Sequence, residues 1–429
     1  MMPMRNVSAG RATVAGFCAS LVGIGLARFG YTPLIPALIG AGWFAASDVV
    51  YLGAANFVGY LVGALLGRTV AARAPAALML RAMMLVTTAG FFACAMPLSF
   101  TWFFLWRFTA GLAGGILMVL AAPTLLPHVP PERRGLAGGV IFTGVGLGIA
   151  GSGTLVPLLA RLGVVEAWCG LGAVALVLTI VSWGGWPDEP PRPQPKAAEA
   201  ARAAITLLGS RGLSHVGPAL RALYVEYAVN AVGLVPHMVF LVDFVARGLG
   251  RGLAAGASYW VCFGIGAMIG PVASGAVADR IGFARALVLA YLLQMAAVAT
   301  PIVTTDPLWF ALSSVVVGAF TPGITTLVLG RVRELVPHDA ALQRSAWGIA
   351  TIGFAAGQGG GAYLFSYLFA QSQSYVLLFE TGVAAIAASL VIDLAASVRR
   401  HPSPLGSRRN IVPPAAAEAL LPQDLGEER

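Results

Sequence analysis

The sequence LLPHVPPERR at residues 125–134 recurs in related form as LVPHDAALQR at residues 335–344, which is 210 residues further along the chain. A second match has nearly the same spacing, because Gly63, Arg68 and Arg73 are each followed 212 residues later by a residue of the same type. Long apolar segments surround all of these copies. Repeats at a fixed spacing indicate a structural unit that has been duplicated, so the chain is expected to consist of two related halves.

The composition indicates that the apolar segments lie in a membrane. Hydrophobic residues make up 58% of the 429 residues and charged residues 10%, and the mean hydropathy is +0.81. A helix that crosses a bilayer needs about 20 mostly apolar residues, whereas barrel strands would show alternating polarity over about ten residues. The pattern predicts an all-α membrane protein with twelve transmembrane helices in two pseudo-symmetric six-helix bundles. The expected spans are residues 13–39, 48–67, 77–97, 101–126, 135–160, 167–186, 219–246, 254–278, 286–304, 307–331, 343–370 and 374–396.

A polar stretch in the middle of the chain separates the two halves. Residues 1–186 are expected to form the N-terminal six-helix bundle, and residues 218–396 the C-terminal one. Between them, residues 187–217 begin with prolines and acidic residues and continue into an Ala-rich charged segment, which predicts a cytoplasmic linker with a short amphipathic helix. Residues 397–429 are rich in proline and charge and are expected to form a disordered cytoplasmic tail.

The basic residues predict the orientation, because short loops rich in Lys and Arg stay on the cytoplasmic side. The first span is too long for a signal peptide and contains Arg28, so the N-terminus is expected to stay inside. Of the 27 Lys and Arg residues, Arg161, Arg247 and Arg251 then fall outside, Arg28 and Arg107 fall within spans, and the other 22 lie on the cytoplasmic face or in the tails. This favours a multi-pass protein of a bacterial cytoplasmic (inner) membrane with both termini in the cytoplasm.

The same asymmetry explains the net charge of +9, since basic cytoplasmic loops are attracted to an anionic leaflet. No interleaving of basic and aromatic residues typical of a nucleic-acid surface is present, so no nucleic-acid partner is expected. The sequence also lacks a catalytic elbow, a phosphate-binding loop and a zinc-binding helix. The four cysteines all lie in expected spans without metal-ligand spacing. We therefore expect no enzyme activity, no cofactor and no metal.

Residues 275–282, GAVADRIG, followed by the basic residue Arg285, resemble the signature loop of the major facilitator superfamily. The loop falls between spans eight and nine, where that superfamily carries its second copy. The first copy, at residues 63–73, is degraded, because Gly67 stands in the place of the aspartate.

Other stretches strengthen the resemblance. Arg107 with glycines four and eight residues later, in span four, resembles a second signature of the superfamily. GIGLARFGYTP at residues 23–33 and ANFVGYL at residues 55–61 resemble the YbfB/YjiJ type of transporter within it. The resemblance covers residues 13–396 and implies two bundles that work by alternating access, with a small-molecule substrate bound between them.

The signature loop also has a physical interpretation. Asp279 lies at the cytoplasmic end of span eight, and a carboxylate beside the first amides of a neighbouring helix is stabilised by about 0.3 to 1 kcal/mol. Resemblance to the superfamily implies that this neighbour is span five. The contact can form only while the cytoplasmic side is closed, so it would act as a conformational latch; the alternative is a loop that only caps and orients a turn. The expected latch residues are Gly275, Asp279, Arg280, Gly282 and Arg285, with Arg68 from the degraded copy.

Arg28 and Arg107 are expected inside the bilayer, where a charged side chain is costly and faces a cavity or a partner. Helical spacing places Tyr31 on the same face of span one as Arg28. Arg107 lies above a stripe formed by Gly111 and Gly115, which would let span four pack closely. Resemblance to the superfamily implies that Arg107 lines the central cavity and contacts substrate or tunes a proton site. A structural hydrogen-bonding role is the alternative.

Span seven carries a polar stripe, because Glu226, Asn230, Gly233 and His237 stand at i, i+4, i+7 and i+11 and therefore share one helix face. We expect this face to look into the central cavity. Glu226 and His237 are the candidates for proton coupling, since a nearby arginine changes the protonation of a buried carboxyl and histidine titrates near neutral pH. The alternatives are a permanent ion pair between Glu226 and Arg28 and a structural histidine.

The remaining charges have simpler interpretations. Asp243 and Arg247 are four residues apart near the outer end of span seven and are expected to form a surface ion pair. Single polar residues within spans are candidates for the cavity lining. The expected substrate-binding residues are Arg28, Tyr31, Asn56, Tyr60, Arg107, Asn230, His237 and Gln358.

These observations predict a secondary active transporter, expected to act as a monomer by symport or antiport. Protons are the favoured coupling ion, because buried titratable residues are present and no ATP-binding loop is found. Two intramembrane arginines favour a small organic anion as substrate, since arginine pairs well with carboxylates. One alternative is an efflux pump for amphipathic or cationic compounds, with Glu226 and a pocket of aromatic residues; another is a non-transporting membrane sensor. The aromatic candidates for the efflux pocket are Phe29, Tyr31, Tyr60, Trp106 and Trp260.

Overall fold

The structure is a computed structural model, and it describes residues 7–71, 74–130, 133–187, 217–337 and 340–398. Within these ranges the chain forms helices and no strand. The amphipathic helix expected in the linker and the expected disordered tail lie outside the described residues.

The N-terminal half begins with one irregular span. This span consists of α1 (Ala9–Ser20), a π-helical segment η1 (Leu21–Leu26), a 3-10 turn η2 (Phe29–Tyr31) and α2 (Leu34–Gly40). Proline cannot donate a backbone hydrogen bond, and Pro33 stands at the start of α2. The regular helices that follow are α3 (Ala46–Ala71), α4 (Ala76–Cys94), α5 (Phe100–Leu125), α6 (Arg134–Leu159) and α7 (Val164–Ser182).

The C-terminal half also begins with an irregular span. It consists of α9 (Pro218–Gly233), a π-helical segment η7 (Pro236–Phe240), a short α10 (Leu241–Asp243) and a second π-helical segment η8 (Phe244–Gly248). The following helices are α11 (Gly252–Ile281), α12 (Phe283–Val303), α13 (Pro307–Leu335), α14 (Ala340–Ser372) and α15 (Tyr375–Val398).

The predicted membrane spans are confirmed. Among the described residues, eleven helical segments are long and apolar enough to cross a bilayer. The twelfth expected span, α14, has 33 residues and is long enough at 1.5 Å per residue, but its glycines, serines and glutamines lower its hydropathy. Breaks inside the first and seventh spans were not predicted.

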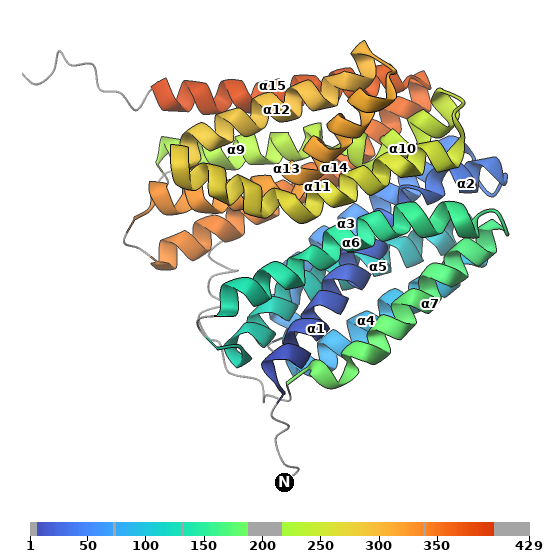
Figure 1. Cartoon of the computed structure of the whole chain (residues 1–429), viewed down its shortest axis with the longest axis horizontal. Coiled ribbons are helices and arrows are strands. Elements are labelled where there is room, and N and C mark those ends of the chain that lie inside the picture. The colour runs from blue at the N-terminus through green and yellow to red at the C-terminus, as the bar shows by residue number, and fades with distance from the viewer. Residues whose placement is uncertain (1–6, 72–73, 131–132, 188–216, 338–339, 399–429) are drawn as a thin grey trace, which may run out of the picture.

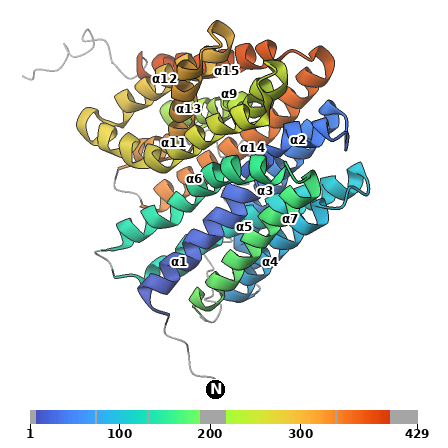
Figure 2. The ribbon, with the colours of Figure 1, turned by 45° about the vertical axis from the view of Figure 1, so that its right-hand side comes forward.

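The helices gather into two bundles, α1 to α7 and α9 to α15 (Figure 1). The bundles meet where α2 lies beside α10, which we call the far end. They diverge toward the end that holds the start of α1 and the residues flanking the linker, which we call the linker end. Figure 2 shows the same divergence after a turn of 45°.

Glycines make the contact between α6 and α11 close. A Cβ atom added to Gly264 of α11 would lie 2.4 Å from the backbone nitrogen of Ala150 in α6, and one added to Gly146 would lie 2.4 Å from the Met268 side chain. Toward the linker end of α6, a Cβ on Gly138 or Gly139 would meet nothing within 4 Å. The two bundles are therefore joined along the middle and far end of this pair of helices and separate at the linker end.

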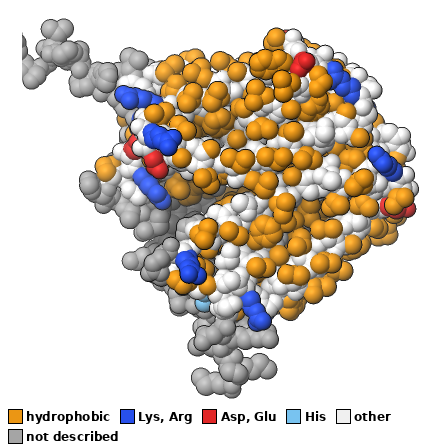
Figure 3. Space-filling view, in the orientation of Figure 1, with side chains coloured by type: hydrophobic (Ala, Val, Ile, Leu, Met, Phe, Trp, Pro, Cys, Tyr) orange, Lys and Arg blue, Asp and Glu red, His pale blue; other side chains and the backbone are white. Residues whose placement is uncertain are grey.

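The outer surface matches a membrane environment. Large hydrophobic side chains such as Leu98, Leu162, Val272 and Val303 are more than 65% exposed. Figure 3 shows hydrophobic side chains across the middle of the visible face and charged side chains mainly toward its two ends. Such a belt is typical of a lipid-facing surface.

The pair of Asp243 and Arg247 exists, but its predicted surface location is wrong. Asp243 is only 1% exposed, and Arg247 donates two hydrogen bonds to its carboxylate, at 2.5 and 2.7 Å. The hydroxyl of Tyr375, at the start of α15, donates to the same carboxylate at 2.6 Å. Tyr375 thus covers the pair and ties the irregular span seven to the last helix.

Candidate functional site

The two bundles meet at Arg28, whose partner lies on α14 of the second bundle. This residue lies in the break of span one, between η1 and η2, and is 7% exposed. Its guanidinium lies 4.2 Å from the ring centre of Phe57 and 4.6 Å from that of Tyr60. Favourable cation–π contact is expected at these distances. No carboxylate among the described residues pairs with Arg28, so its charge is not neutralised there.

The partner of Arg28 across the interface is Gln358 of α14. Arg28 donates a short hydrogen bond through a terminal guanidinium nitrogen to the side-chain oxygen of Gln358. Gln358 in turn donates from Nε2 to the sulfur of Met238, at 3.6 Å. The backbone oxygen of Met238 accepts a 2.6 Å bond from the hydroxyl of Thr32. Arg28 and Thr32 of the first bundle are therefore both fastened to Met238, one through Gln358 and one directly.

Aromatic residues of the second bundle complete this region. Tyr227 stacks on Phe354 with ring centres 4.4 Å apart, and its hydroxyl donates to Thr325 at 3.1 Å. Tyr227 also lies within electrostatic range of Tyr60 of the first bundle. Of the expected substrate-binding residues, the structure thus brings Arg28, Tyr60 and Gln358 together.

Asn56, Arg107 and Tyr31 lie instead inside the first bundle. Arg107 donates to the backbone oxygen of Ala27 at 2.8 Å, and its guanidinium lies 4.1 Å from the ring centre of Tyr31. Asn56 donates to the backbone oxygen of Arg107 at 3.1 Å. The carbonyl of Ala27 is free to accept because the helix is broken after it, and Ala27 directly precedes Arg28. This arrangement fits the structural alternative for Arg107.

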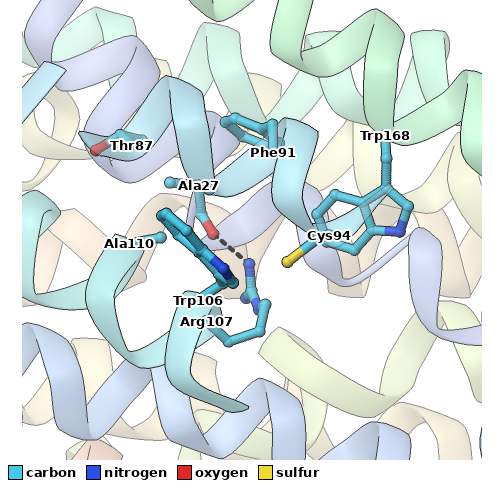
Figure 4. Close-up of a pocket in the computed structure, with 9 residues that line it drawn as sticks. Ala27, Thr87, Phe91, Cys94, Trp106, Arg107, Ala110 and Trp168 are labelled. Atoms are coloured by element: carbon cyan, nitrogen blue, oxygen red, sulfur yellow. Dashed lines mark hydrogen bonds between the residues drawn. The ribbon is translucent and has the colours of Figure 1, made fainter. Parts of the chain in front are cut away.

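Figure 4 shows the small pocket beside Arg107. Its walls come from the N-terminal bundle alone, so it does not lie at the interface between the bundles. The lining residues are Ala27, Thr87, Gly90, Phe91, Cys94, Trp106, Arg107, Ala110 and Trp168.

The stripe on span seven shares one face as predicted, but the direction predicted for this face is wrong. Asn230 donates to Gln294 of α12 at 2.8 Å. A Cβ on Gly233 would touch Ile386 of α15, and the His237 ring packs edge-on against Phe379 of α15. The stripe therefore faces the interior of its own bundle and not the interface.

The hydrogen bonds of His237 identify its tautomer. Ser313 donates its single proton to the backbone oxygen of Ala297 at 2.6 Å. His237 Nε2 lies 2.8 Å from the same hydroxyl, so this nitrogen must donate and carry the proton. Its Nδ1 has no hydrogen-bond partner among the described residues. The His237 ring is thus held within its own bundle through Nε2.

Glu226 is 1% exposed and Asp393 is 4% exposed. Both carboxylates lie within electrostatic range of the Tyr291 hydroxyl, so α9, α12 and α15 enclose a buried acidic region. Arg28 does not pair with Glu226, and the permanent ion pair considered from the sequence is absent in this structure. Asp393 is not among the candidates that the sequence suggested, because it stands close to the end of the last predicted span.

The signature loop is at the linker end. Asp279, Arg280 and Arg285 are exposed, and the structure gives Asp279 no hydrogen bond or ion pair with the described residues of α6. Gly282 joins α11 to α12 at φ +84°, a conformation that favours glycine. Glu334 accepts from the Phe283 amide at 3.2 Å and so caps α12. A Cβ atom added to Gly275 would lie 3.8 Å from the side chain of Thr326. The side chain of Arg68 lies outside the described residues.

Sequence reasoning also missed Met238, Tyr227 and Phe57 at the interface. Tyr227 and Met238 each follow a residue of the polar stripe on span seven, so a shift of one position along the helix would have found them. Phe57 is one residue after Asn56 in the stretch that carries the family resemblance.

Comparison with solved structures agrees with this architecture. The crystal structure of a D-xylose-proton symporter matches with a TM-score of 0.67, covering 90% of this chain and 96% of that chain at 16% identity. A likeness at this identity shows the fold alone.

Comparison with curated proteins finds two relatives, both described as uncharacterized MFS-type transporters. They come from Mycobacterium tuberculosis strains CDC 1551 / Oshkosh and ATCC 25618 / H37Rv, and each is 30% identical over 207 residues. The match covers 46% of this chain and 42% of each relative, so the chain spans less than half the length of these relatives.

A family model gives the widest match. The model of the uncharacterised MFS-type transporter YbfB matches residues 20–394, which include both bundles, the break at Arg28 and the signature loop. The resemblance seen in the sequence is thereby confirmed, and the fold and family are those of a transporter rather than an enzyme. The chain belongs to the YbfB-type family of transporters within the major facilitator superfamily.

Proposed function

We propose that this protein transports a small organic anion across a bacterial cytoplasmic membrane, that it is coupled to protons, and that Arg28 binds the anion. One observation carries the proposal. Arg28 is buried between the bundles within the first membrane span, where its guanidinium meets Gln358 and aromatic rings but no carboxylate of the described chain.

The physical basis is the cost of that charge. An arginine at the centre of a membrane helix is unfavourable by about 2.5 to 3.5 kcal/mol on insertion scales. A carboxylate neutralises it and can accept two parallel hydrogen bonds from its planar fork. An organic anion is therefore the substrate class that gains most from binding at this position.

Alternating access follows from the family and the two bundles. With the linker end in the cytoplasm, as the basic residues predict, the described conformation opens inward. Asp279 is exposed and has no hydrogen bond or ion pair with the described side chains of α6, which agrees with a latch that forms only when the cytoplasmic side closes. Both termini are then cytoplasmic, and one chain holds a whole site, which favours a monomer.

Proton coupling is assigned to Glu226. Its carboxyl group is buried in the second bundle with Asp393 and Tyr291 near by, so its protonation changes the charge of the bundle interior. His237 is a weaker candidate, because Ser313 fixes its donor nitrogen and the ring faces its own bundle.

A second candidate is an efflux pump for amphipathic cations. The rings of Phe57, Tyr60, Tyr227 and Phe354 near the interface favour it, since aromatic faces attract cations. Arg28 opposes it, because its positive charge already lies against two of these rings and repels another cation.

Uptake into proteoliposomes tests the proposal. A panel of organic acids and amphipathic cations is measured with and without an imposed pH gradient. We expect accumulation of an acid, with kcat/KM lowered about 100-fold or more in Arg28→Gln, because each charged hydrogen bond contributes about 1.5 to 3 kcal/mol. Arg28→Lys should be intermediate, since it keeps the charge and loses the fork.

Two further variants serve as controls. Arg161→Gln removes an exposed arginine of the far end and should transport as the native protein does. Glu226→Gln should still exchange the anion but lose its response to the pH gradient. Transport of cations that survives Arg28→Gln would favour efflux, and no flux of any compound would favour the sensor.

A further inference from the structure

Gln358 joins the two bundles through both ends of its amide group. The side chain is 3% exposed; its oxygen accepts from Arg28 and its nitrogen donates to the sulfur of Met238. Met238 lies in the π-helical segment η7, and its backbone oxygen holds Thr32. Two hydrogen-bonded connections therefore lead from the first bundle to Met238. One runs from Arg28 through Gln358, and the other comes directly from Thr32.

The amide oxygen is a neutral counterpart of a carboxylate oxygen. It accepts one hydrogen bond from Arg28 but leaves the positive charge in place, and the Nε atom of Arg28 keeps no hydrogen-bond partner among the described residues. A carboxylate adds a second hydrogen bond and neutralises the charge. A neutral hydroxyl or amide of a solute offers no more than Gln358 already does.

We propose that Gln358 occupies the place of the substrate on Arg28, so that an organic anion must displace it to bind. This inference rests on the proposed role of Arg28. Competition with Gln358 selects anions over neutral solutes, because only a charged group gains enough to replace the amide. Gln358 is therefore a selectivity residue that competes with the substrate.

Displacement also has a mechanical effect. Once Gln358 leaves Arg28, its second bond, to Met238, is no longer held in position. Met238 is followed within a few residues by α10, which lies against α2 at the far end (Figure 1). Binding of the anion therefore weakens the contact between α2 and α10 that closes the far end, whereas this contact stays intact in the empty protein.

Two substitutions act on Gln358 in opposite directions. Gln358→Glu places a carboxylate permanently on Arg28, which should lock the bundles together and block the anion. Gln358→Leu removes the competitor, and we expect the anion to bind about fivefold more tightly, the equivalent of one ordinary hydrogen bond. Gln371→Glu, at an exposed position of the same helix, is the matched control for the added charge.

Closure of the far end is measured by cross-linking. Tyr51 of α3 and Tyr363 of α14 face each other across the bundles with ring centres 6.0 Å apart. Replacing both by cysteine, with the half-buried Cys169 and Cys262 changed to alanine, gives a pair for a short bifunctional reagent. Gln358→Glu should raise the yield over the native background and Gln358→Leu should lower it, while Gln371→Glu leaves it unchanged.

The outcomes separate this inference from the proposed function. An unchanged yield in Gln358→Glu overturns the inference, and this readout requires no known substrate. Unaltered anion affinity in Gln358→Leu, with binding lost in Arg28→Gln, overturns it while the anion site stands. A raised yield in Gln358→Glu together with native anion transport in Arg28→Gln keeps the connection from Arg28 through Gln358 and overturns both the anion site and the competition.

Discussion

Spans one and seven occupy corresponding places in the two halves, and both are broken helices. Arg28 and His237 are 209 residues apart, which is close to the spacing of the sequence repeats. Arg28 turns outward to Gln358 of the other bundle, whereas His237 turns inward to Ser313 of its own. Both halves therefore have a broken helix at the corresponding place, but the side chain there contacts the other bundle in the first half and its own bundle in the second.

The two bundles also differ in the charges they bury. Among the described residues, the first buries Arg28 and Arg107, and the second buries Glu226, Asp243 and Asp393. A buried charge is tolerated where it has a partner or a function. In the first bundle a backbone carbonyl and aromatic rings surround the arginines, so the bundle interface is left with a cation available to a ligand.

The largest expected effect on stability and transport is that of removing Arg107, one of the two arginines that the structure describes as buried in the first bundle. Arg107→Ala removes the 2.8 Å hydrogen bond to the carbonyl of Ala27, which keeps only the 3.5 Å bond from Asn56, and empties the space against Tyr31. We expect about 3 kcal/mol or more of lost stability and loss of transport, measured by thermal unfolding in detergent and by uptake. Arg107→Lys should recover part of both. Equal melting temperatures for Arg107→Ala and the exposed Arg161→Ala would contradict the structural role.

A smaller effect is expected where the bundles meet. Gly146→Ala places a methyl group 2.4 Å from Met268 and 2.8 Å from the backbone oxygen of Gly264. Overpacking of this kind costs about 1 to 3 kcal/mol and should slow transport, because the bundles no longer approach. Gly139→Ala on the same helix meets open space and is the control. Slow transport in both variants would mean that transport needs these glycines for bending of α6 and not for close contact with α11.

The anchor of span seven gives the next effect. Tyr375→Phe removes the 2.6 Å bond to Asp243 and the 3.1 Å bond from Arg247. We expect a loss of about 1 kcal/mol, seen as a small fall in melting temperature, with the Asp243–Arg247 pair intact. A fall as large as that of Asp243→Asn would show that the tyrosine, and not the ion pair, holds the far half of the span.

The smallest effect is expected at His237, the counterpart of Arg28. Glutamine can still donate to Ser313 from its amide nitrogen, so His237→Gln should cost about 1 kcal/mol or less and leave the pH dependence of uptake unchanged. Glu226→Gln measured beside it should remove that dependence. A shifted pH profile in His237→Gln would restore the histidine as a coupling residue.

The sequence predicted the fold well because its signals are global. Twelve apolar segments, two repeats and the loop at residues 275–282 each indicate the same architecture, and the structure and family match confirm it. The division at residues 187–217 stays a prediction, because most of that stretch lies outside the described residues.

The site was harder to predict, for a physical reason. Glu226, Asn230 and His237 do share a face, but in a bilayer a polar face is buried equally well against its own bundle or against the partner. Hydropathy and spacing cannot separate these directions. The break before Arg28 depends on how η1 packs on other helices, such as the approach of Gly25 to Gly148, and this contact has no local sequence signal.

The two bonds that converge on Met238 have a kinetic consequence. These bonds hold the bundles together in the empty protein, and binding of the anion weakens them. The conformational change of the empty protein should therefore be slower than that of the loaded protein. Anion on the opposite side of the membrane would then accelerate the movement of labelled anion, and one-for-one exchange would run faster than net flux. The hydrogen bonds to the sulfur and to the backbone oxygen of Met238 would thus determine whether the protein works mainly as an exchanger or accumulates the anion.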